Sequence, residues 1–454
     1  YNGTRQCYLL LDGGQTSPRV TDVQNTQWGA EAKFLIAYYH VSILRKYGPC
    51  PSVDDTCNPN IALPEMPGRS HYDYVTDYIV NILDEIMPDL PADRSGSEWG
   101  RASQVVAKAV KARVLLYAAS PLWNGNTDYA DFKNTNFETP GYGLELVSQT
   151  FDANKWERAR RACQEALDFA QQLGYELYKP TTFAELNSMP AGPEKDFKVH
   201  VLRMRYLVTT RPNETDNNRE IIFGLPSQGS IIASWPHRVL QKSNGDWVSG
   251  YSGIAPTLNA IEQFYTENGY LPAEDPAFYP QDEWFQRAEA GSEIIKFHKN
   301  REPRFYAWIG FDGGEYGVKM KQGQPVILNF KSSQSHGYNP DLFNRDNTPT
   351  GYLSQKYIHP RLEITSTGSN NGGQLEAHRP VIRLAELYLS LAEAQAMVSQ
   401  HLGTNYKTQA LNNLNEIRDR AGIPKLTLSE FEQDPMKWIR QERFAEFFQE
   451  GQRY

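Results

Sequence analysis

The chain has 454 residues, which is enough for a large core and, by length alone, for roughly three domain-sized units. Lysine and arginine together number 46, aspartate and glutamate number 54, and the net charge is −8. This balance argues against a nucleic-acid partner and against a helix held on anionic lipid, because both need clustered positive charge. No stretch approaches the roughly 20 apolar residues of a membrane-spanning helix, and no signal peptide is recognisable.

The first third of the chain is predicted to be helical. Apolar residues recur three and four positions apart, which is the period of an amphipathic helix, and a glycine or proline ends each run. The four runs are Ala30 to Leu44, Val75 to Ile86, Val106 to Tyr117 and Trp156 to Leu173. We expect two helix hairpins that pack as tetratricopeptide repeats do, although no 34-residue repeat aligns.

The middle of the chain, from about 175 to 377, is predicted to hold short strands, long loops and only one good helix. Glu220–Gly224 is typical of a buried strand and Thr257–Phe264 of a short helix. Loops rich in Gly, Asn, Ser and Pro cover 227–256, 265–293 and 331–377. Loops of this length inside a compact protein are usually functional or disordered.

Helical patterning returns near Val381 and continues to the end of the chain. Three amphipathic blocks are predicted to be helices, and they cover residues 379–394, 410–424 and 440–454.

Four cysteines are too few for a disulfide-built scaffold. Cys50 and Cys57 flank a loop rich in proline and aspartate, and the sequence leaves open whether they form a local bridge or stay free thiols. Cys163 lies on an apolar helix face and is expected in the core.

Catalytic motifs of zinc proteases, serine hydrolases and P-loop enzymes are absent from the sequence. The histidines are scattered singly, so His237 and His298 are interpreted as structural residues. Asp128 and Asp131 offer oxygen ligands for Ca²⁺, but their spacing does not match a calcium loop, and a solvated acidic loop is favoured. No cofactor or metal is predicted.

Paired carboxylates are the groups that glycosidases use. Glu442 and Glu446 share one helix face, but Arg440 and Arg443 lie close by, and such neighbours favour ion pairs that keep both carboxylates ionised. Glu386 and Glu393 are interpreted in the same way, so no catalytic residue is predicted.

Several blocks, in their order along the chain, resemble the SusD/RagB family. The C-terminal blocks carry the strongest likeness, above all Arg379–Ala394, Ala410–Pro424 and Arg440–Tyr454. Earlier blocks with the same likeness are Glu31–Tyr39, Arg45–Pro49, Gly100–Asn126, Trp156 with Ala159, Ala255–Thr257, Phe264–Tyr265 and Asn300–Tyr306.

The resemblance implies a mainly α fold, with a tetratricopeptide-like helical scaffold and a loop-rich, minor-β middle subdomain. The expected parts are residues 1–175 (scaffold), 176–378 (middle subdomain) and 379–454 (helices that complete the scaffold). Family members normally have a signal peptide, a lipid-bearing cysteine and a longer C-terminal end. Cys7 is not in a lipobox and the chain has no initiator Met, so both ends are expected to be cut.

Family members are surface lipoproteins of Bacteroidetes that capture nutrients for a SusC-like TonB-dependent transporter, as in the starch utilisation system. The resemblance therefore implies a non-enzymatic, cell-surface protein of the outer membrane that binds an oligosaccharide or a peptide, with membrane contact only through an N-terminal lipid anchor outside this chain. Three alternatives stay open: a peptide importer of the RagB type, a secreted polymer hydrolase, and a scaffold that binds only proteins.

Ligand contacts are expected where aromatic and polar side chains occur together in a loop. The segment 227–253 meets this condition best, and its candidate ligand-binding residues are Trp235, Trp247, Tyr251, Asn244 and Asp246. A second candidate segment runs from Trp123 to Tyr129, although Trp123 itself is expected to pack its loop onto the scaffold.

Overall fold

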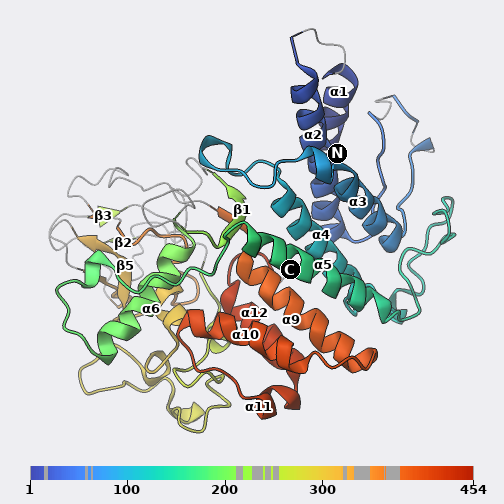
Figure 1. Cartoon of the computed structure of the whole chain (residues 1–454). Helices are drawn as coiled ribbons and strands as arrows, with labels where there is room; N and C mark the ends of the chain where they lie inside the picture. Colours follow the sequence, from blue (N-terminus) through green and yellow to red (C-terminus); the bar gives the residue numbers. More distant parts are fainter. Residues whose placement is uncertain are drawn as a thin grey trace. The chain divides into compact units, whose positions relative to one another are not determined.

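The computed structural model describes residues 2–14, 19–56, 60–62, 65–210, 218–226, 239–240, 247–248, 255–320, 325–331, 348–361, 363–364 and 379–452. The protein is mainly helical with a few small sheets (Figure 1), which confirms the predicted fold class. No helix in the described part of the chain is long and apolar enough to cross a membrane.

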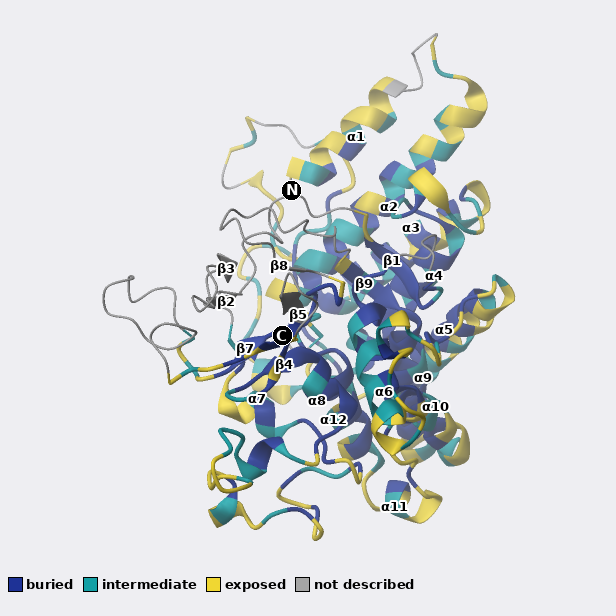
Figure 2. Ribbon diagram, turned by 90° about the vertical axis from the view of Figure 1, so that its left-hand side faces the viewer, coloured by how far each residue is buried: buried dark blue, intermediate teal, exposed yellow. Residues whose placement is uncertain are grey.

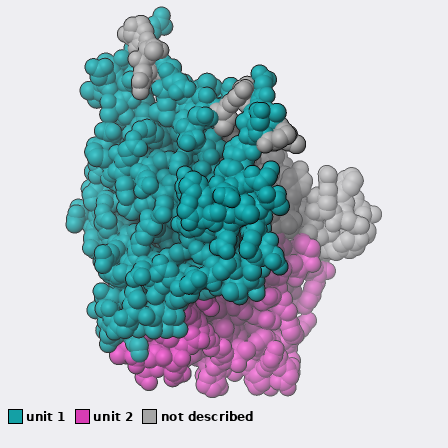
Figure 3. Space-filling model, turned by 90° about the vertical axis from the view of Figure 1, so that its right-hand side faces the viewer, with its two compact units in different colours: residues 1–175, 382–413, 454 teal, residues 176–381, 414–453 magenta. Residues whose placement is uncertain are grey.

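Two compact units make up the chain (Figure 3). The first unit contains residues 1–175, 382–413 and 454, and the second contains residues 176–381 and 414–453. The three-part division expected from the sequence stays a prediction.

Helices of the first unit pack on one another in chain order. Each of the first four packs on the next, and α9, from late in the chain, packs on α4 and α5. Their bounds are α1 (Asn2–Gly14), α2 (Asp22–Tyr47), α3 (Tyr72–Ile86), α4 (Gln104–Ala119), α5 (Asn154–Gln172) and α9 (Leu384–His401). The four helices predicted from apolar spacing are α2 to α5, whereas α1 was not predicted.

Helix α2 shows how local sequence sets the ends of these helices. Thr21 Oγ1 accepts a hydrogen bond from the Gln24 amide, and Gln24 Oε1 accepts one from the Thr21 amide, which forms a capping box. Gly48 ends the helix at φ +68°, a conformation that residues with a Cβ rarely adopt. A Cβ at Gly48 would also lie 2.7 Å from the Trp123 ring, so the position needs glycine for two reasons.

Helix α4 is buried along most of its length, in contrast to the largely exposed α1 (Figure 2). It packs against α3, α5 and α9, so few of its faces meet water. The charged Arg113 lies inside this helix at 6% exposure. Its Nε and Nη2 atoms donate to Oε1 and Oε2 of Glu386 on α9, each over 2.6 Å. Glu386 is thus ion-paired, as predicted.

Helices and short strands alternate in the second unit. Its helices are α6 (Pro193–Leu207), α7 (Leu258–Glu262), α8 (Pro303–Trp308), α11 (Leu428–Gln433) and α12 (Pro435–Glu446), while α10 (Lys407–Ala421) contributes residues to both units. Short 3₁₀ turns occur in both units, at η2 (Met87–Asp89), η3 (Gly96–Glu98), η4 (Thr127–Tyr129), η5 (Ala184–Leu186), η8 (Gln281–Glu283) and η9 (Lys296–His298).

The prediction of a single good helix in the middle of the chain was wrong. The predicted helix exists as α7, but α6 and α8 form there as well. Helix α6 is hard to recognise in the sequence because Arg203 occupies a buried position that an apolar residue would normally take. Its guanidinium donates to the backbone oxygens of Pro180 and Arg420, and these bonds offset the cost of burying the charge.

The sheets are small. Strand β1 (Ile221–Leu225) pairs with β9 (Arg379–Arg383), and β2 (Val239–Leu240) pairs antiparallel with β3 (Trp247–Val248). The other strands are β4 (Ile309–Gly310) with β7 (Leu353–Ser354), and β6 (Pro325–Ile327), β5 (Glu315–Met320) and β8 (Glu363–Ile364) in that order. Strand β1 confirms the predicted strand, whereas β9 occupies the first five residues of the block predicted as helix from 379.

Candidate functional site

Most of the predicted ligand-binding residues lie outside the described residues. These are Trp235, Asn244, Asp246 and Tyr251. Trp247 begins β3, where its backbone pairs with Leu240 of β2. A ligand contact by this loop therefore stays a prediction.

Trp123, in the second predicted segment, has a packing role. Its ring stacks on Tyr72 with the centroids 4.3 Å apart, and on Tyr129 with the centroids 5.6 Å apart. Asn124, next in the chain, is buried and exchanges two hydrogen bonds of 2.9 Å with the backbone of Asp152. These contacts fix the loop between α4 and α5, as expected for Trp123.

A polar pocket of about 440 Å³ opens in the first unit beside this loop. Pockets that bind small molecules typically measure about 300–1,000 Å³. Residues of α3, of the C-terminal part of α4, of the loop before α5 and of the first turns of α5 line it: Asp73, Thr76, Asp77, Leu115, Ala118, Tyr142, Ser148, Thr150, Asp152, Asn154, Lys155 and Arg158. No local sequence pattern indicates this pocket, because its residues come from three separate segments.

Ion pairs order one wall of the polar pocket. Lys155 Nζ donates to both carboxylate oxygens of Asp73, each over 2.7 Å, and Ser148 Oγ donates to Asp73 Oδ2 over 2.6 Å. Arg158 Nη1 donates to Asp77 Oδ1 over 2.6 Å, and both side chains of this pair are nearly half exposed. The Asp73 carboxylate is therefore well satisfied inside the wall, while the Asp77–Arg158 pair faces solvent.

Tyr142 lines the same pocket on a rigid support. Its ring stacks on the buried His71 ring, with the centroids 3.9 Å apart and the planes at 12°. The Tyr142 amide donates to Thr139 O over 2.9 Å, and the His71 amide donates to Thr139 Oγ1 over 2.9 Å. Burial lowers the pKa of His71 to about 4, so this ring is neutral at pH 7.

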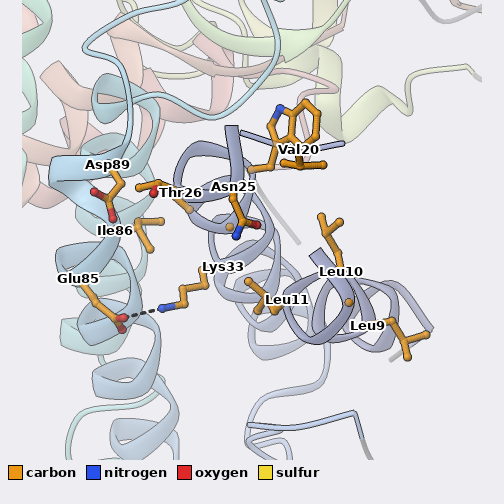
Figure 4. Close-up of a pocket in the computed structure, with 14 residues that line it drawn as sticks. Leu9, Leu10, Leu11, Val20, Asn25, Thr26, Lys33, Glu85, Ile86 and Asp89 are labelled. Atoms are coloured by element: carbon orange, nitrogen blue, oxygen red, sulfur yellow. Dashed lines mark hydrogen bonds and ion pairs between the residues drawn. The ribbon is translucent and has the colours of Figure 1, made fainter. Parts of the chain in front are cut away.

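A second pocket, of about 470 Å³, lies among α1, α2 and α3 (Figure 4). Leu9, Leu10 and Leu11 of α1 line one side, and an ion pair between Lys33 and Glu85 lies across from them. The Nζ–Oε1 distance of this pair is 2.6 Å. Trp28, Asn25 and Thr26 of α2 also line this pocket, so its lining contains an aromatic ring and polar groups beside the leucines.

Comparison with known proteins decides the family. The profile of the SusD family matches residues 202–454, more than half of the chain. The chain belongs to the SusD family.

Solved structures agree with this assignment. The chain is similar to the structure named BT4246, with 46% identity and a TM-score of 0.88 over 99% of this chain and 76% of that one. A SusD-like protein from Bacteroides fragilis, BF3747, has 24% identity and a TM-score of 0.69 over 98% and 71% of the two chains. BF0978, a SusD-like carbohydrate-binding protein from the same species, has 18% identity and a TM-score of 0.64 over 99% and 69%. Comparison with curated proteins gave no match.

SusD-family proteins are binding proteins and generally not catalytic. In this member, the carboxylates considered for glycosidase chemistry lie in a buried charge cluster of the second unit, made of Glu220, Glu302, Arg304, Arg418, Arg420, Glu442 and Glu446. Glu442 and Glu446 are ion-paired, as predicted, but the arginines that they contact come from α8 and α10.

Distances in the buried charge cluster are short. Arg304 Nη1 lies 2.6 Å from Glu442 Oε1, and Arg420 Nη2 lies 2.5 Å from Glu446 Oε1. Burial opposes the charge of Arg304, but the surrounding carboxylates outweigh it and raise the pKa of its guanidinium. All these side chains are almost fully excluded from water, so the structure assigns them to stability rather than to turnover.

In the described part of the chain, no three His, Cys, Asp or Glu side chains are grouped as metal ligands. Asp128 and Asp131 are both exposed. Cys163 is buried, as predicted, and Cys50 is a buried free thiol, whereas Cys57 lies outside the described residues.

His298 is a structural residue, as predicted. It is buried among aromatic rings, and its Nε2 lies 2.9 Å from the Tyr352 hydroxyl. Burial and the nearby Arg301 lower the pKa of His298 to about 3. In the unfolded chain the imidazole of His298 is protonated near pH 6.5. The stability that the neutral ring contributes to the folded protein is therefore lost as pH falls below that value.

We therefore expect His298→Gln to destabilise the protein more at pH 7.5 than at pH 4.5. From pH 7.5 to pH 4.5, the free energy of unfolding of the wild type should fall by on the order of 2–3 kcal/mol more than that of the variant, because glutamine does not titrate. Thermal unfolding of both proteins at both pH values measures this difference. An equal gap at the two pH values would show that His298 has the same pKa in the folded protein as in the unfolded chain.

Proposed function

We propose that this protein captures an oligosaccharide at the cell surface of a Bacteroidetes bacterium and delivers it to a SusC-like TonB-dependent transporter. Membership of the SusD family is the observation that carries this proposal. BF0978, which has the same fold, is described as a carbohydrate-binding protein, and this supports a glycan as the ligand. We propose that the protein is a non-enzymatic lipoprotein of the outer membrane.

Isothermal titration calorimetry tests the ligand class. The purified protein would be titrated with malto-, laminari- and xylogluco-oligosaccharides and with a pool of short peptides. Saturable binding of one glycan class supports the proposal. Binding of peptides alone would replace it with a RagB-like peptide importer, and turnover of a glycan during the titration would replace it with a hydrolase.

The transporter partner needs a separate test. Outer membranes of the source organism would be solubilised in mild detergent, and the protein would be captured through an affinity tag. Co-purification of a TonB-dependent barrel protein in a fixed ratio supports delivery to a transporter. Capture of this protein without such a barrel would remove the transporter from the proposal but leave glycan binding intact.

Trp247→Ala tests the predicted contact by segment 227–253. If this ring stacks on sugar, its loss should weaken glycan binding about tenfold, because an aromatic anchor is typically worth more than 1 kcal/mol. Phe285→Ala is the control, since this ring is 62% exposed and lies outside the segment. Equal affinity of the Trp247 variant and the wild type would place the ligand elsewhere.

A further inference from the structure

The polar pocket of the first unit has the properties of a sugar site and is not part of segment 227–253. Its volume of about 440 Å³ falls within the range of small-molecule sites. Its lining combines one aromatic ring with carboxylate, guanidinium, amide and hydroxyl groups. These are the groups that bind the C–H face and the hydroxyls of a sugar.

Tyr142 provides the aromatic face. One face of its ring is covered by His71, so the opposite face is the one that can meet a ligand in the pocket that Tyr142 lines. The face of an aromatic ring carries partial negative charge, which attracts the weakly positive C–H groups of a pyranose. Because the 139–143 turn and the His71 ring already hold Tyr142 in place, binding would cost little ordering of this side chain.

Charges in the pocket select the kind of sugar. Lys155 is bound to both oxygens of Asp73, so this pair contributes little net charge. The pair Asp77–Arg158 is more exposed and presents both an acceptor and donors, as sugar hydroxyls require. Asp152 adds a further carboxylate to the lining. With three carboxylates against two cations, the pocket disfavours an acidic sugar such as a uronate.

We propose that this pocket binds one hexose unit of a neutral oligosaccharide, with the sugar stacked on Tyr142 and its hydroxyls bonded by Asp77 and Arg158. The inference rests on the proposed function, since it assumes that the ligand is a glycan. Beyond the proposed function, it adds a sugar-contact site in the first unit, and it excludes acidic glycans as the preferred ligands of this site.

Calorimetry of pocket variants tests this inference. Tyr142→Ala should weaken binding of a neutral oligosaccharide about tenfold, as expected for loss of an aromatic anchor. Tyr142→Phe keeps the ring and should retain most of the affinity. Arg158→Gln, at a side chain that is 47% exposed, removes hydroxyl contacts without disturbing the core and should also weaken binding. Tyr47→Ala, at an exposed tyrosine in the same unit, is the matched control and should bind as the wild type does.

The possible results separate this inference from the proposed function. Weaker binding by Tyr142→Ala and Arg158→Gln, with unchanged binding by Tyr47→Ala, supports the site. If both pocket variants bind a neutral glycan as tightly as the wild type, the site is overturned and glycan capture stands. A preference for oligogalacturonate over neutral oligosaccharides overturns the proposed sugar class. If the wild type binds no glycan, both proposals are overturned.

Discussion

Replacing Arg304 with alanine should lower the free energy of unfolding of the second unit by about 3–5 kcal/mol or more, because it removes one of the three arginines that balance the buried carboxylates. Arg304 is fully buried and contacts three carboxylates, those of Glu302, Glu442 and Glu446. These carboxylates are 0% exposed, so their contacts are with protein groups rather than with bulk water. Chemical denaturation followed by near-UV circular dichroism measures the loss.

The control for Arg304 is an exposed ion pair of the same unit. Lys437 lies 2.8 Å from Glu274, and its side chain is 45% exposed. Lys437→Ala should cost at most about 1 kcal/mol, since water solvates both charges when the pair is broken. If the two variants lose equal stability, the buried charge cluster does not stabilise the unit in the way that its geometry indicates.

Replacing Arg113 with alanine should destabilise the first unit by a similar amount, about 3–5 kcal/mol, because the buried Glu386 loses the two charged hydrogen bonds that Arg113 donates. Burial opposes the charge of the Arg113 guanidinium, but the Glu386 carboxylate outweighs this effect and raises the pKa of Arg113, so the guanidinium is charged in the folded protein. Thermal unfolding of the variant measures the loss of stability.

A double variant tests whether the unpaired charge of Glu386 causes the loss of stability in Arg113→Ala. In Arg113→Met with Glu386→Leu, both charges of the pair are removed, and apolar side chains fill their space. Stability should then recover most of what Arg113→Ala loses, since buried ion pairs often contribute little over apolar packing. Failure to recover would mean that Arg113 and Glu386 stabilise the helices through bonds that apolar packing cannot replace. Lys33→Ala, at an exposed pair with Glu85, is the control and should cost at most about 1 kcal/mol.

Helices were predicted correctly where one face is exposed to solvent and the opposite face is buried. Helices α3 and α5 carry their apolar residues on one side, and their ends are marked by proline and glycine. The prediction failed for α6, where the buried Arg203 interrupts the apolar period. It also placed the start of α9 five residues early, because the strand β9 pairs with a segment more than 150 residues away and no local pattern reveals that partner.

Site residues were harder to predict than the helices. A sequence shows which aromatic residues fall in loops, but it does not show what they contact. Trp123 is a loop aromatic that packs against other rings. Tyr142 had a weak local signal, since it lies between two glycines, Gly141 and Gly143, with positive φ. Nothing in the sequence joins it to Asp77 or Arg158, and only the packing of α3 against α4 and of α4 against α5 brings these residues to one pocket.

The sequence by itself determined the family, the helical class and the positions of most scaffold helices, because these depend on short-range periodicity and on the order of blocks along the chain. Tertiary structure alone decided the partners of the charged residues. Glu442 contacts Arg304, 138 residues away, and Arg113 contacts Glu386, 273 residues away. A buried charge takes whichever opposite charge the fold brings within hydrogen-bond distance, and chain order does not specify that neighbour.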